Sequence, residues 1–294
     1  MTIFQIKCFL EVGKYLNFTK AAESLYTSQP SITKHVLSLE NELNLQLFIR
    51  TKHYVRFTPA GKMLYKEFQD ILNYINIIID KATRISLDME GGELNIGCLE
   101  VLNTDLFLPL ILKKFTERYS NINLSFESHS FKALRHNLIN GKLDIVFTLS
   151  FSLADLSNLQ HHSVYKAEVY IAIPRSHPLA DKKNLNLSDF KEDIFIVTSQ
   201  DDSPEGIEFI EKLCNNYGFL PKKYIQAPTL QSQILSLESS LGISILDSSL
   251  RTYKNKNIRF IKINNKDAVV NVNAVWRKDN TNPSLALFSS VLPD

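Results

Sequence analysis

The sequence predicts an α/β protein in three parts: a small helical domain with a hairpin, one long helix, and a two-lobed α/β domain. Short helical patterns fill residues 1–58, one apolar repeat covers residues 59–89, and strand and helix patterns alternate from residue 92 onward. The chain has 294 residues, of which 44% are hydrophobic and 22% charged. This length and composition are typical of about two folded units and not of a disordered protein.

Basic residues are unevenly distributed along the chain. Residues 1–58 hold seven Lys and Arg against four Glu, whereas the remaining residues hold 26 basic and 27 acidic side chains. A local positive excess suits a polyanionic partner, although a solvated surface is the commoner cause of such an excess. Charges interrupt the first fifteen positions and no apolar run reaches the length of a membrane span, so we expect a cytoplasmic protein without a membrane partner.

Residues 1–27 predict two short helices. The first carries an apolar stripe that includes Ile6 and Phe9. The second contains Ala21 and Ala22, whose small side chains allow a neighbouring helix to approach closely. A brief turn at residues 26–27 then leads into a third helix.

The third helix has one apolar face and one polar face. It begins after Ser28, a natural N-cap, and Pro30 fits its first turn. Ile32, Val36 and Leu39 share the stripe that faces the core. The opposite face carries side chains that can donate and accept hydrogen bonds at base edges in a major groove. A hydrated surface helix without a partner is the alternative interpretation.

Two short strands, at residues 47–50 and 54–57, predict a hairpin directly after this helix. The hairpin gathers four basic side chains in one place: Arg50, Lys52, His53 and Arg56. A basic hairpin beside a groove-reading helix forms a wing, so the pattern favours nucleic-acid binding over a bare surface helix.

Five sequence blocks carry a family resemblance: AAESL at residues 21–25, SQPSITK at 28–34, LENEL at 39–43, LFIR at 47–50 and FTPAG at 57–61. In order and spacing they resemble the winged helix-turn-helix of LysR-type transcriptional regulators. The family usually has leucine at position 57 and often arginine at position 34. Lys34 therefore lacks the bidentate fork that arginine offers to a guanine.

The predicted DNA-binding residues lie on the third helix and the hairpin. The resemblance implies that base reading falls to Gln29, Pro30, Thr33 and Lys34, and contacts with the DNA backbone or minor groove to Arg50, Lys52 and His53. The remaining predicted contacts, including two serines that could reach phosphate, come from Ser28, Ser31, Ser38 and Arg56.

An apolar repeat predicts a long helix over residues 59–89 that pairs with a second copy of the chain. The spacing alternates between 4 and 3 through Leu64, Phe68, Ile71, Ile75, Ile78, Ala82 and Ile85. Strict alternation of this kind is typical of a two-helix seam. Leu72 and Ile79 broaden the stripe, so a helix that packs on its own domain is the alternative. A two-fold homodimer would read a partly palindromic operator.

The rest of the chain, residues 90–294, predicts an effector domain. Paired glycines at 91–92 end the long helix, and strands and helices alternate afterwards. The pattern resembles the periplasmic-binding-protein-like effector domain of LysR-type regulators. We expect lobe one at residues 92–162 and 267–294, and lobe two at residues 163–266.

Ligands of open α/β sheets bind beyond the carboxyl ends of the strands, so the cleft between the lobes is the predicted effector site. The positions that fall there are Cys98, Leu99, Glu100, Ser128, Ser130, Thr148, Thr198, Gln200 and Thr229. The family commonly has a small hydroxyl residue near 99 and 100 that holds a carboxylate. Leu99 and Glu100 instead predict a neutral ligand, a cationic ligand or none. A Glu100 that faces solvent or pairs with a local cation is the alternative.

Catalytic motifs are absent from the sequence: there is no Gly-x-Ser-x-Gly elbow, phosphate-binding glycine loop or His-Glu-x-x-His helix. We predict no catalytic residue, cofactor or metal, and therefore no enzyme. The sequence instead predicts a LysR-type DNA-binding transcriptional regulator controlled by a small-molecule effector. A receptor that acts mainly through protein partners and binds DNA weakly is the alternative. The resemblance also implies a homodimer, a homotetramer, and RNA polymerase as a candidate partner.

Overall fold

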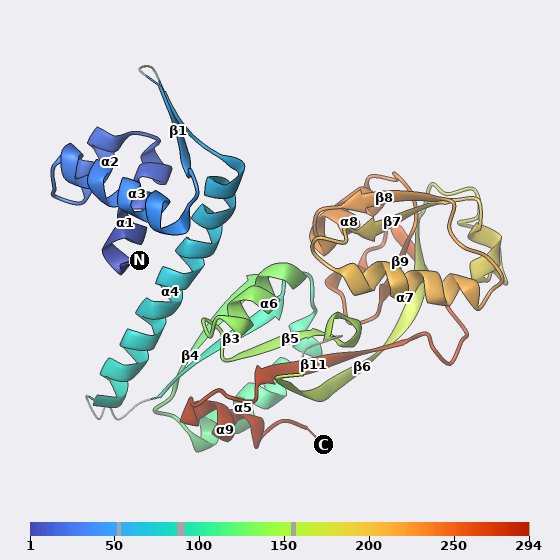
Figure 1. Cartoon of the computed structure of the whole chain (residues 1–294). Helices are drawn as coiled ribbons and strands as arrows, with labels where there is room; N and C mark the ends of the chain where they lie inside the picture. Colours follow the sequence, from blue (N-terminus) through green and yellow to red (C-terminus); the bar gives the residue numbers. More distant parts are fainter. Residues whose placement is uncertain (52–53, 87–91, 154–156, 294) are drawn as a thin grey trace. The chain divides into compact units, whose positions relative to one another are not determined.

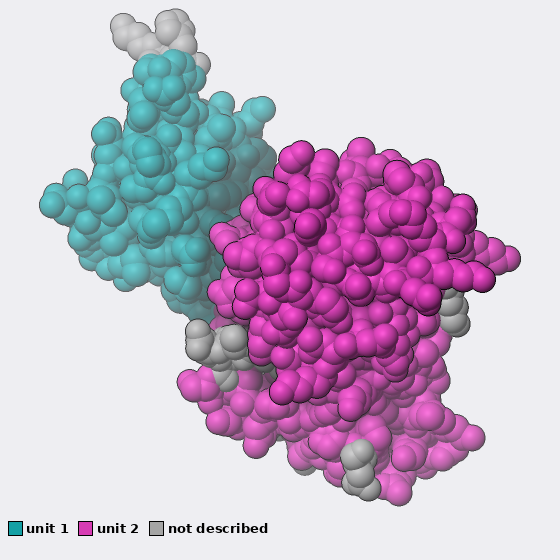
Figure 2. Space-filling model, turned by 90° about the vertical axis from the view of Figure 1, so that its right-hand side faces the viewer, with its two compact units in different colours: residues 1–88 teal, residues 89–294 magenta. Residues whose placement is uncertain are grey.

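The computed structural model describes residues 1–51, 54–86, 92–153 and 157–293. The chain forms two compact units, Met1–Asp88 and Met89–Asp294 (Figure 2). Each unit has a hydrophobic cluster of its own. Within the described residues, no helix combines the length and the apolar character that a membrane crossing requires.

Unit 1 is a helical domain with a hairpin and a long helix. Its elements follow the predicted order (Figure 1): α1 (Ile3–Tyr15), α2 (Phe18–Ser24), α3 (Gln29–Leu43), β1 (Phe48–Arg50), β2 (Val55–Phe57) and α4 (Pro59–Ser86). Each of the first three helices starts at a side chain that accepts a backbone N–H of the first turn: Thr2, Asn17 and Ser28. Local sequence therefore determines where these helices begin.

The core of unit 1 is centred on Phe9, which is fully buried. The Phe9 ring centroid lies 5.3 Å from that of Phe48 on β1 and 6.0 Å from that of Phe68 on α4. Ala21 and Ala22 are buried, as expected for a helix that others approach closely. One aromatic cluster thus holds α1, the hairpin and the start of α4 together.

The first turn of α4 lies against the start of β1. The Thr58 hydroxyl donates to the carbonyl of Gln46 at 2.7 Å and accepts the Gly61 N–H at 2.9 Å. A Cβ added at Gly61 would lie 2.0 Å from the carbonyl oxygen of Leu47. Only glycine permits this approach, so the FTPAG block fixes the hairpin onto α4.

Unit 2 contains a seven-stranded sheet in the order β10-β6-β11-β5-β3-β4, with β9 beside β6, and a separate parallel pair, β7 and β8. Its strands are β3 (Glu93–Leu99), β4 (Asn123–His129), β5 (Ile145–Leu149), β6 (Leu159–Pro174), β7 (Ile194–Thr198), β8 (Lys223–Ala227), β9 (Ser244–Asp247), β10 (Ile258–Lys262) and β11 (Val269–Arg277). Its α-helices are α5 (Leu108–Arg118), α6 (Phe131–Ile139), α7 (Pro204–Asn215), α8 (Leu230–Glu238) and α9 (Pro283–Ser289). β3 pairs in parallel with β4 and β5, as the alternating pattern predicts.

Strand β6 connects the two lobes of unit 2 (Figure 1). Its first part, up to Glu168, pairs with β11, and its last part pairs with β9 and β10. Lobe one contains β3, β4, β5, α5, α6 and α9, and lobe two contains β7, β8, β9, α7 and α8. Residues 169–173 of β6 have the apolar pattern that predicts a strand, whereas its first part, β8 and β10 do not. These three segments carry many polar or half-buried residues, so they lack the apolar run of a central strand.

Candidate nucleic-acid interface and effector cavity

The outer face of α3 is an open, mostly polar surface. Ile32, Val36 and Leu39 on its inner face are fully buried, which turns the opposite side toward solvent. An open depression follows that side and is lined by Gln29, Pro30, Thr33, Lys34, Leu37, Ser38, Asn41 and Glu42. The structure therefore brings together the four residues predicted to read bases.

Hydrogen bonds order the first turns of α3. The Ser28 hydroxyl accepts the Ser31 N–H at 3.4 Å and caps the helix. The Thr33 hydroxyl donates to the Gln29 carbonyl at 3.0 Å, and the Gln29 amide Nε2 donates to the Thr33 oxygen at 3.3 Å. The Gln29 carboxamide thus lies along the exposed face of the helix.

Two predicted DNA contacts have structural roles in the protein. Gln5 on α1 donates to the Ser38 hydroxyl at 2.9 Å, which joins α1 to α3. Arg50 Nη2 lies 2.5 Å from Glu40 Oε2, and the Arg50 guanidinium stacks 4.7 Å from the centre of the Phe18 ring. Arg50 therefore has a partner within the domain, and its contact with DNA stays a prediction.

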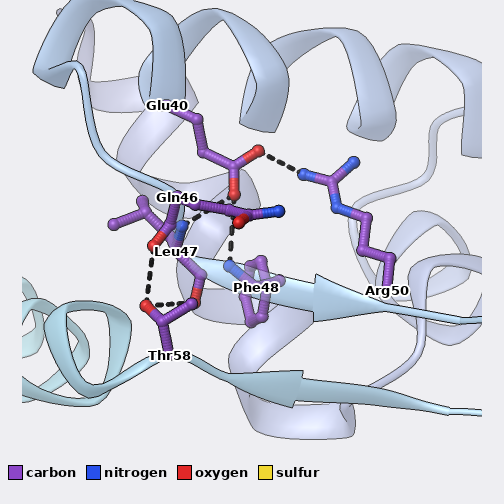
Figure 3. Close-up of polar contacts among 6 residues, drawn as sticks. All are labelled: Glu40, Gln46, Leu47, Phe48, Arg50 and Thr58. Carbon is purple, nitrogen blue, oxygen red and sulfur yellow. Dashed lines mark hydrogen bonds and ion pairs between the residues drawn. The ribbon is translucent and has the colours of Figure 1, made fainter.

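Glu40 organises the hairpin around α3 (Figure 3). The Glu40 side chain is buried, and its Oε1 accepts the backbone N–H groups of Leu47 at 2.8 Å and Phe48 at 3.1 Å. Its Oε2 faces Arg50. Both carboxylate oxygens are therefore used, and the buried charge has a cation beside it.

Of the three other basic residues predicted in the hairpin, only Arg56 is among the described residues. Lys52 and His53 lie outside the described residues. Arg56 is exposed, and its guanidinium lies 5.4 Å from the centre of the Tyr54 ring. Arg56 is therefore the predicted hairpin cation that the described structure leaves accessible to a phosphate.

The sequence patterns missed Tyr26, in the turn between α2 and α3. Its side chain is 98% exposed, and its backbone φ of 51° lies in the left-handed region. The Tyr26 N–H donates to the Glu23 carbonyl at 3.2 Å and the Thr27 N–H to the Ala22 carbonyl at 3.0 Å, so the turn is fixed. The signal that could have identified Tyr26 is its place directly after a helix, where glycine or asparagine would adopt the left-handed conformation without strain.

The apolar stripe of α4 divides into two parts. Phe68 is buried in the core of unit 1, and Leu64 packs against the same cluster, so these two side chains face their own domain. Ile71 and Ile78 are 47% and 48% exposed, and Ile75 is half-buried. The side chains of Ala82 and Ile85 lie outside the described residues. Phe68 thus packs on Phe9 within unit 1, and the seam stays a prediction.

Residues of both lobes enclose a cavity of about 40 Å³ in unit 2. Its polar wall residues are Thr198, Ser203, Gln233 and Asp247, and the rest of the wall includes Phe131, Phe151, Phe209, Leu230, Leu246 and Val270. A volume of this size holds about three water molecules. The two lobes are therefore closed on each other.

Of the residues predicted for the effector site, Thr198 alone lines this cavity. Its hydroxyl donates to Gln233 Oε1 at 2.7 Å. The other predicted side chains do not line this cavity, so their contact with an effector stays a prediction. Cys98 and Leu99 belong to the buried core, and burial raises the pKa of the Cys98 thiol to about 12. Thr148 is buried and lies 3.0 Å from the Ser152 hydroxyl.

The remaining predicted effector residues lie at the surface or at helix starts. Ser128 and Gln200 are exposed. Ser130 precedes α6, and the Thr229 hydroxyl caps α8 by accepting the Ser232 N–H at 3.2 Å. Ser128 lies near the end of β4, and the other three residues follow strand ends, as expected.

Charged groups hold the lobes together across the cleft. Glu100, which follows β3 in lobe one, accepts the N–H of Gln231 in the first turn of α8 at 3.2 Å, where the helix dipole favours a carboxylate. Lys132 on α6 lies 2.6 Å from Asp201 of lobe two. Glu100 therefore has a hydrogen-bond donor in the first turn of α8.

The sequence patterns did not predict two polar side chains of the cavity wall, Ser203 and Asp247. The Ser203 hydroxyl is buried and has no hydrogen-bond partner within the described part of the chain. Asp247 is buried, and both hydrogen bonds that reach it, from the N–H and hydroxyl of Ser249, end on Oδ1. Burial raises the pKa of Asp247 to about 6. An acid directly at the end of the apolar strand β9 is the signal that could have identified it.

Comparison with known proteins identifies the family. Residues 3–62 match the family model described as "Bacterial regulatory helix-turn-helix protein, lysR family", and residues 88–293 match the one described as "LysR substrate binding domain". The chain belongs to the LysR family of transcriptional regulators. It is a DNA-binding regulator with an effector-binding domain, and the family consists of regulators, not enzymes.

Similar LysR-type and related regulators span nearly the whole chain. The HTH-type transcriptional regulator AlsR of Bacillus subtilis is 26% identical over 293 residues, which cover 98% of this chain and 94% of AlsR. YtlI of the same organism is 30% identical over 267 residues, 91% of this chain and 84% of YtlI. The crystal structure of the LysR-family regulator CbnR covers all of both chains, with a TM-score of 0.71 and 20% identity. Full-length CbnR bound to its target DNA gives a TM-score of 0.70, with 20% identity and 99% of each chain covered.

Within the described residues of this LysR-family chain, no group of three or more His, Cys, Asp or Glu side chains is placed to hold a metal ion.

We expect Arg50→Ala to destabilise unit 1 by about 1–3 kcal/mol, because it leaves the Glu40 carboxylate buried without its cation. Urea unfolding followed by far-ultraviolet circular dichroism measures the effect. Arg56→Ala is the matched control: it removes an exposed arginine of the same hairpin and should change the free energy of unfolding by less than about 0.5 kcal/mol. Equal effects of the two changes would contradict the assigned roles.

We expect Asp247→Asn to remove a pH dependence of stability in unit 2. The pKa of Asp247 is raised in the folded state, so its ionisation opposes folding, and wild-type stability falls as pH rises from about 4 to beyond about 6. At neutral pH the variant should be more stable by about 2–3 kcal/mol, and near pH 4 the two proteins should be equal. Trp276 is the single tryptophan and lies on β11, so its fluorescence during urea unfolding reports on unit 2. If the free energies of unfolding of the wild type and the variant differed by the same amount at every pH in this range, Asp247 would not be the group that causes the pH dependence.

Proposed function

We propose that this regulator recognises its operator by inserting α3 into the major groove. The observation that carries the proposal is the exposed polar face of α3, opposite three fully buried side chains. Gln29 offers a carboxamide of the kind that pairs with adenine, Lys34 offers a cation to guanine, and Pro30 offers apolar contact to a thymine methyl group. Arg56 on the hairpin contacts a phosphate and fixes the orientation of the domain.

The turn before α3 adds Tyr26 to the proposed interface. Phosphates line both edges of the groove that receives α3, and N-terminal residues of a recognition helix lie near them. An exposed tyrosine hydroxyl can donate to a phosphate oxygen. The left-handed backbone of Tyr26 is strained for a tyrosine, and such strain is often found at functional sites.

Dimerisation is proposed through the exposed part of the α4 stripe. Ile71 and Ile78 are exposed apolar side chains seven residues apart, at equivalent positions of the repeat. A two-fold pair of α4 helices would present two copies of α3 to an inverted repeat. Association into a homotetramer and contact with RNA polymerase extend this proposal by analogy with the family.

The cavity between the lobes is the proposed effector site. Its wall combines aromatic rings with a few polar groups, which is typical of small-molecule sites. Entry of an effector requires the lobes to separate, and this would alter the contacts that Glu100 and Lys132 make across the cleft. Effector binding would thereby change the conformation of unit 2.

Substitutions at Gln29 and Arg56 test DNA recognition, with a duplex fragment selected by the wild-type protein from its source genome and a scrambled duplex. Gln29→Ala should reduce the preference for the selected fragment by about 10-fold and leave the salt dependence unchanged. Arg56→Ala should weaken binding to both duplexes and reduce the slope of log K against log salt by about one. Fluorescence anisotropy over a salt series measures both quantities. No binding to any duplex at low salt, or identical effects of both changes, would overturn the proposal.

Substitutions at Tyr26 separate DNA binding from stability. Tyr26→Phe should lower affinity for both duplexes by roughly 3-fold to 10-fold, since one hydrogen bond is lost, without changing the salt slope. Tyr26→Asn should weaken binding in the same way but raise the free energy of unfolding by about 0.5–1 kcal/mol, because asparagine tolerates the left-handed region. Anisotropy and urea unfolding give the two readouts. Wild-type affinity in the phenylalanine variant would exclude the phosphate contact.

A further inference from the structure

The cavity wall contains a buried carboxylate that lacks a cationic partner. Within the described ranges 1–51, 54–86, 92–153 and 157–293, no Lys, Arg or His forms an ion pair with Asp247. The two hydrogen bonds from Ser249 both end on Oδ1. Buried charges in proteins are normally paired, because desolvation of an isolated charge is unfavourable. Oδ2 therefore remains available for a donor inside the cavity.

Three phenyl rings line the same cavity. The Phe131 and Phe151 centroids lie 5.7 Å apart, and the Phe151 ring stacks on Phe209 at 5.3 Å. Aromatic faces attract cations and also pack against short hydrocarbon groups. The rings offer no ligand to a metal ion, so this wall favours an organic cation over an inorganic one.

The remaining polar groups of the cavity wall are also compatible with a ligand that donates hydrogen bonds. Thr198 and Gln233 bond to each other, and Gln233 Nε2 donates to the Ile196 carbonyl at 2.9 Å. The Ser203 hydroxyl is buried without a partner within the described residues and can accept a hydrogen bond. The start of α7 offers little to an anion, since Pro204 has no N–H and the Gly206 N–H donates to the Ser203 carbonyl.

We propose that this cavity binds a small organic ammonium ion, whose N–H groups donate to Asp247 and whose short apolar body packs against Phe151 and Phe209. This inference rests on the proposed effector site and specifies the chemistry of its ligand. The volume of about 40 Å³ limits the ligand to a few non-hydrogen atoms while the lobes stay closed. The ionised state of Asp247 above about pH 6 agrees with a cationic ligand at neutral pH.

Thermal unfolding of the full chain at neutral pH tests the proposal with three compounds of similar size: propylammonium chloride, 1-propanol and sodium propionate. Propylammonium should raise Tm in a saturable way, by roughly 5–10 °C at about 100 times its Kd, whereas propanol and propionate should not. Sodium chloride at matched ionic strength controls for a general salt effect. Stabilisation by propionate, equal stabilisation by all three compounds, or no response to propylammonium would each overturn the proposal.

Two matched substitutions locate the effect. Asp247→Asn keeps the side-chain shape and should abolish the propylammonium response, while Asp181→Asn, at an exposed aspartate, should retain it. A response that persists in Asp247→Asn would place the ligand elsewhere. The comparison of propylammonium with propionate needs only the wild-type protein, so it decides the proposal even if the Asp247 variant fails to fold. Wild-type binding to the genome-selected duplex, measured in parallel, separates failure of this inference from failure of the DNA-binding proposal.

Discussion

The buried carboxylate of Glu40 is the interaction on which the DNA-binding geometry depends. It belongs to α3, which we propose carries the base-reading residues, and it holds the first strand of the hairpin through two backbone N–H groups and Arg50. An α-helix and a hairpin have no fixed mutual orientation by themselves. The buried Glu40 carboxylate, whose two oxygens are both used, imposes an orientation on them. Rotation of the hairpin relative to α3 would leave this charge desolvated and unpaired. The contacts of Glu40 within unit 1 therefore determine the distance between Lys34 on α3 and Arg56 on the hairpin.

The long helix α4 uses one apolar repeat for two purposes. At Phe68 the repeat completes the core of unit 1, and at Ile78 the same repeat is exposed to solvent. A continuous stripe makes both contacts possible without a change in helix geometry, because positions three and four residues apart stay on one face. Because the first turns of α4 pack on the core of unit 1, the direction in which Ile71 and Ile78 face is fixed.

The two acidic side chains Glu100 and Asp247 of unit 2 have different surroundings. Glu100 is satisfied by a helix terminus, whereas Asp247 is buried beside phenyl rings without a cation. Sites of this kind are common where a protein binds a ligand, because binding energy offsets the cost of burying the charge. Glu100 predicts a ligand that is not anionic from the sequence, and the buried Asp247 disfavours an anion in the cavity for a different reason.

The sequence determined the features that depend on residues within a few positions of one another: the N-cap at Ser28, the buried face that begins at Ile32, the hairpin, and the alternation of strands and helices. It also indicated the family through blocks of adjacent residues. Tertiary structure alone decided that Arg50 serves Glu40, that Phe68 is internal, and that Asp247 and Ser203 share a cavity. These contacts join residues that are far apart in the sequence and form only when the helices and strands pack. A local sequence pattern carries no information about them. Helix faces follow from local periodicity, whereas ion-pair partners and cavity walls follow from packing.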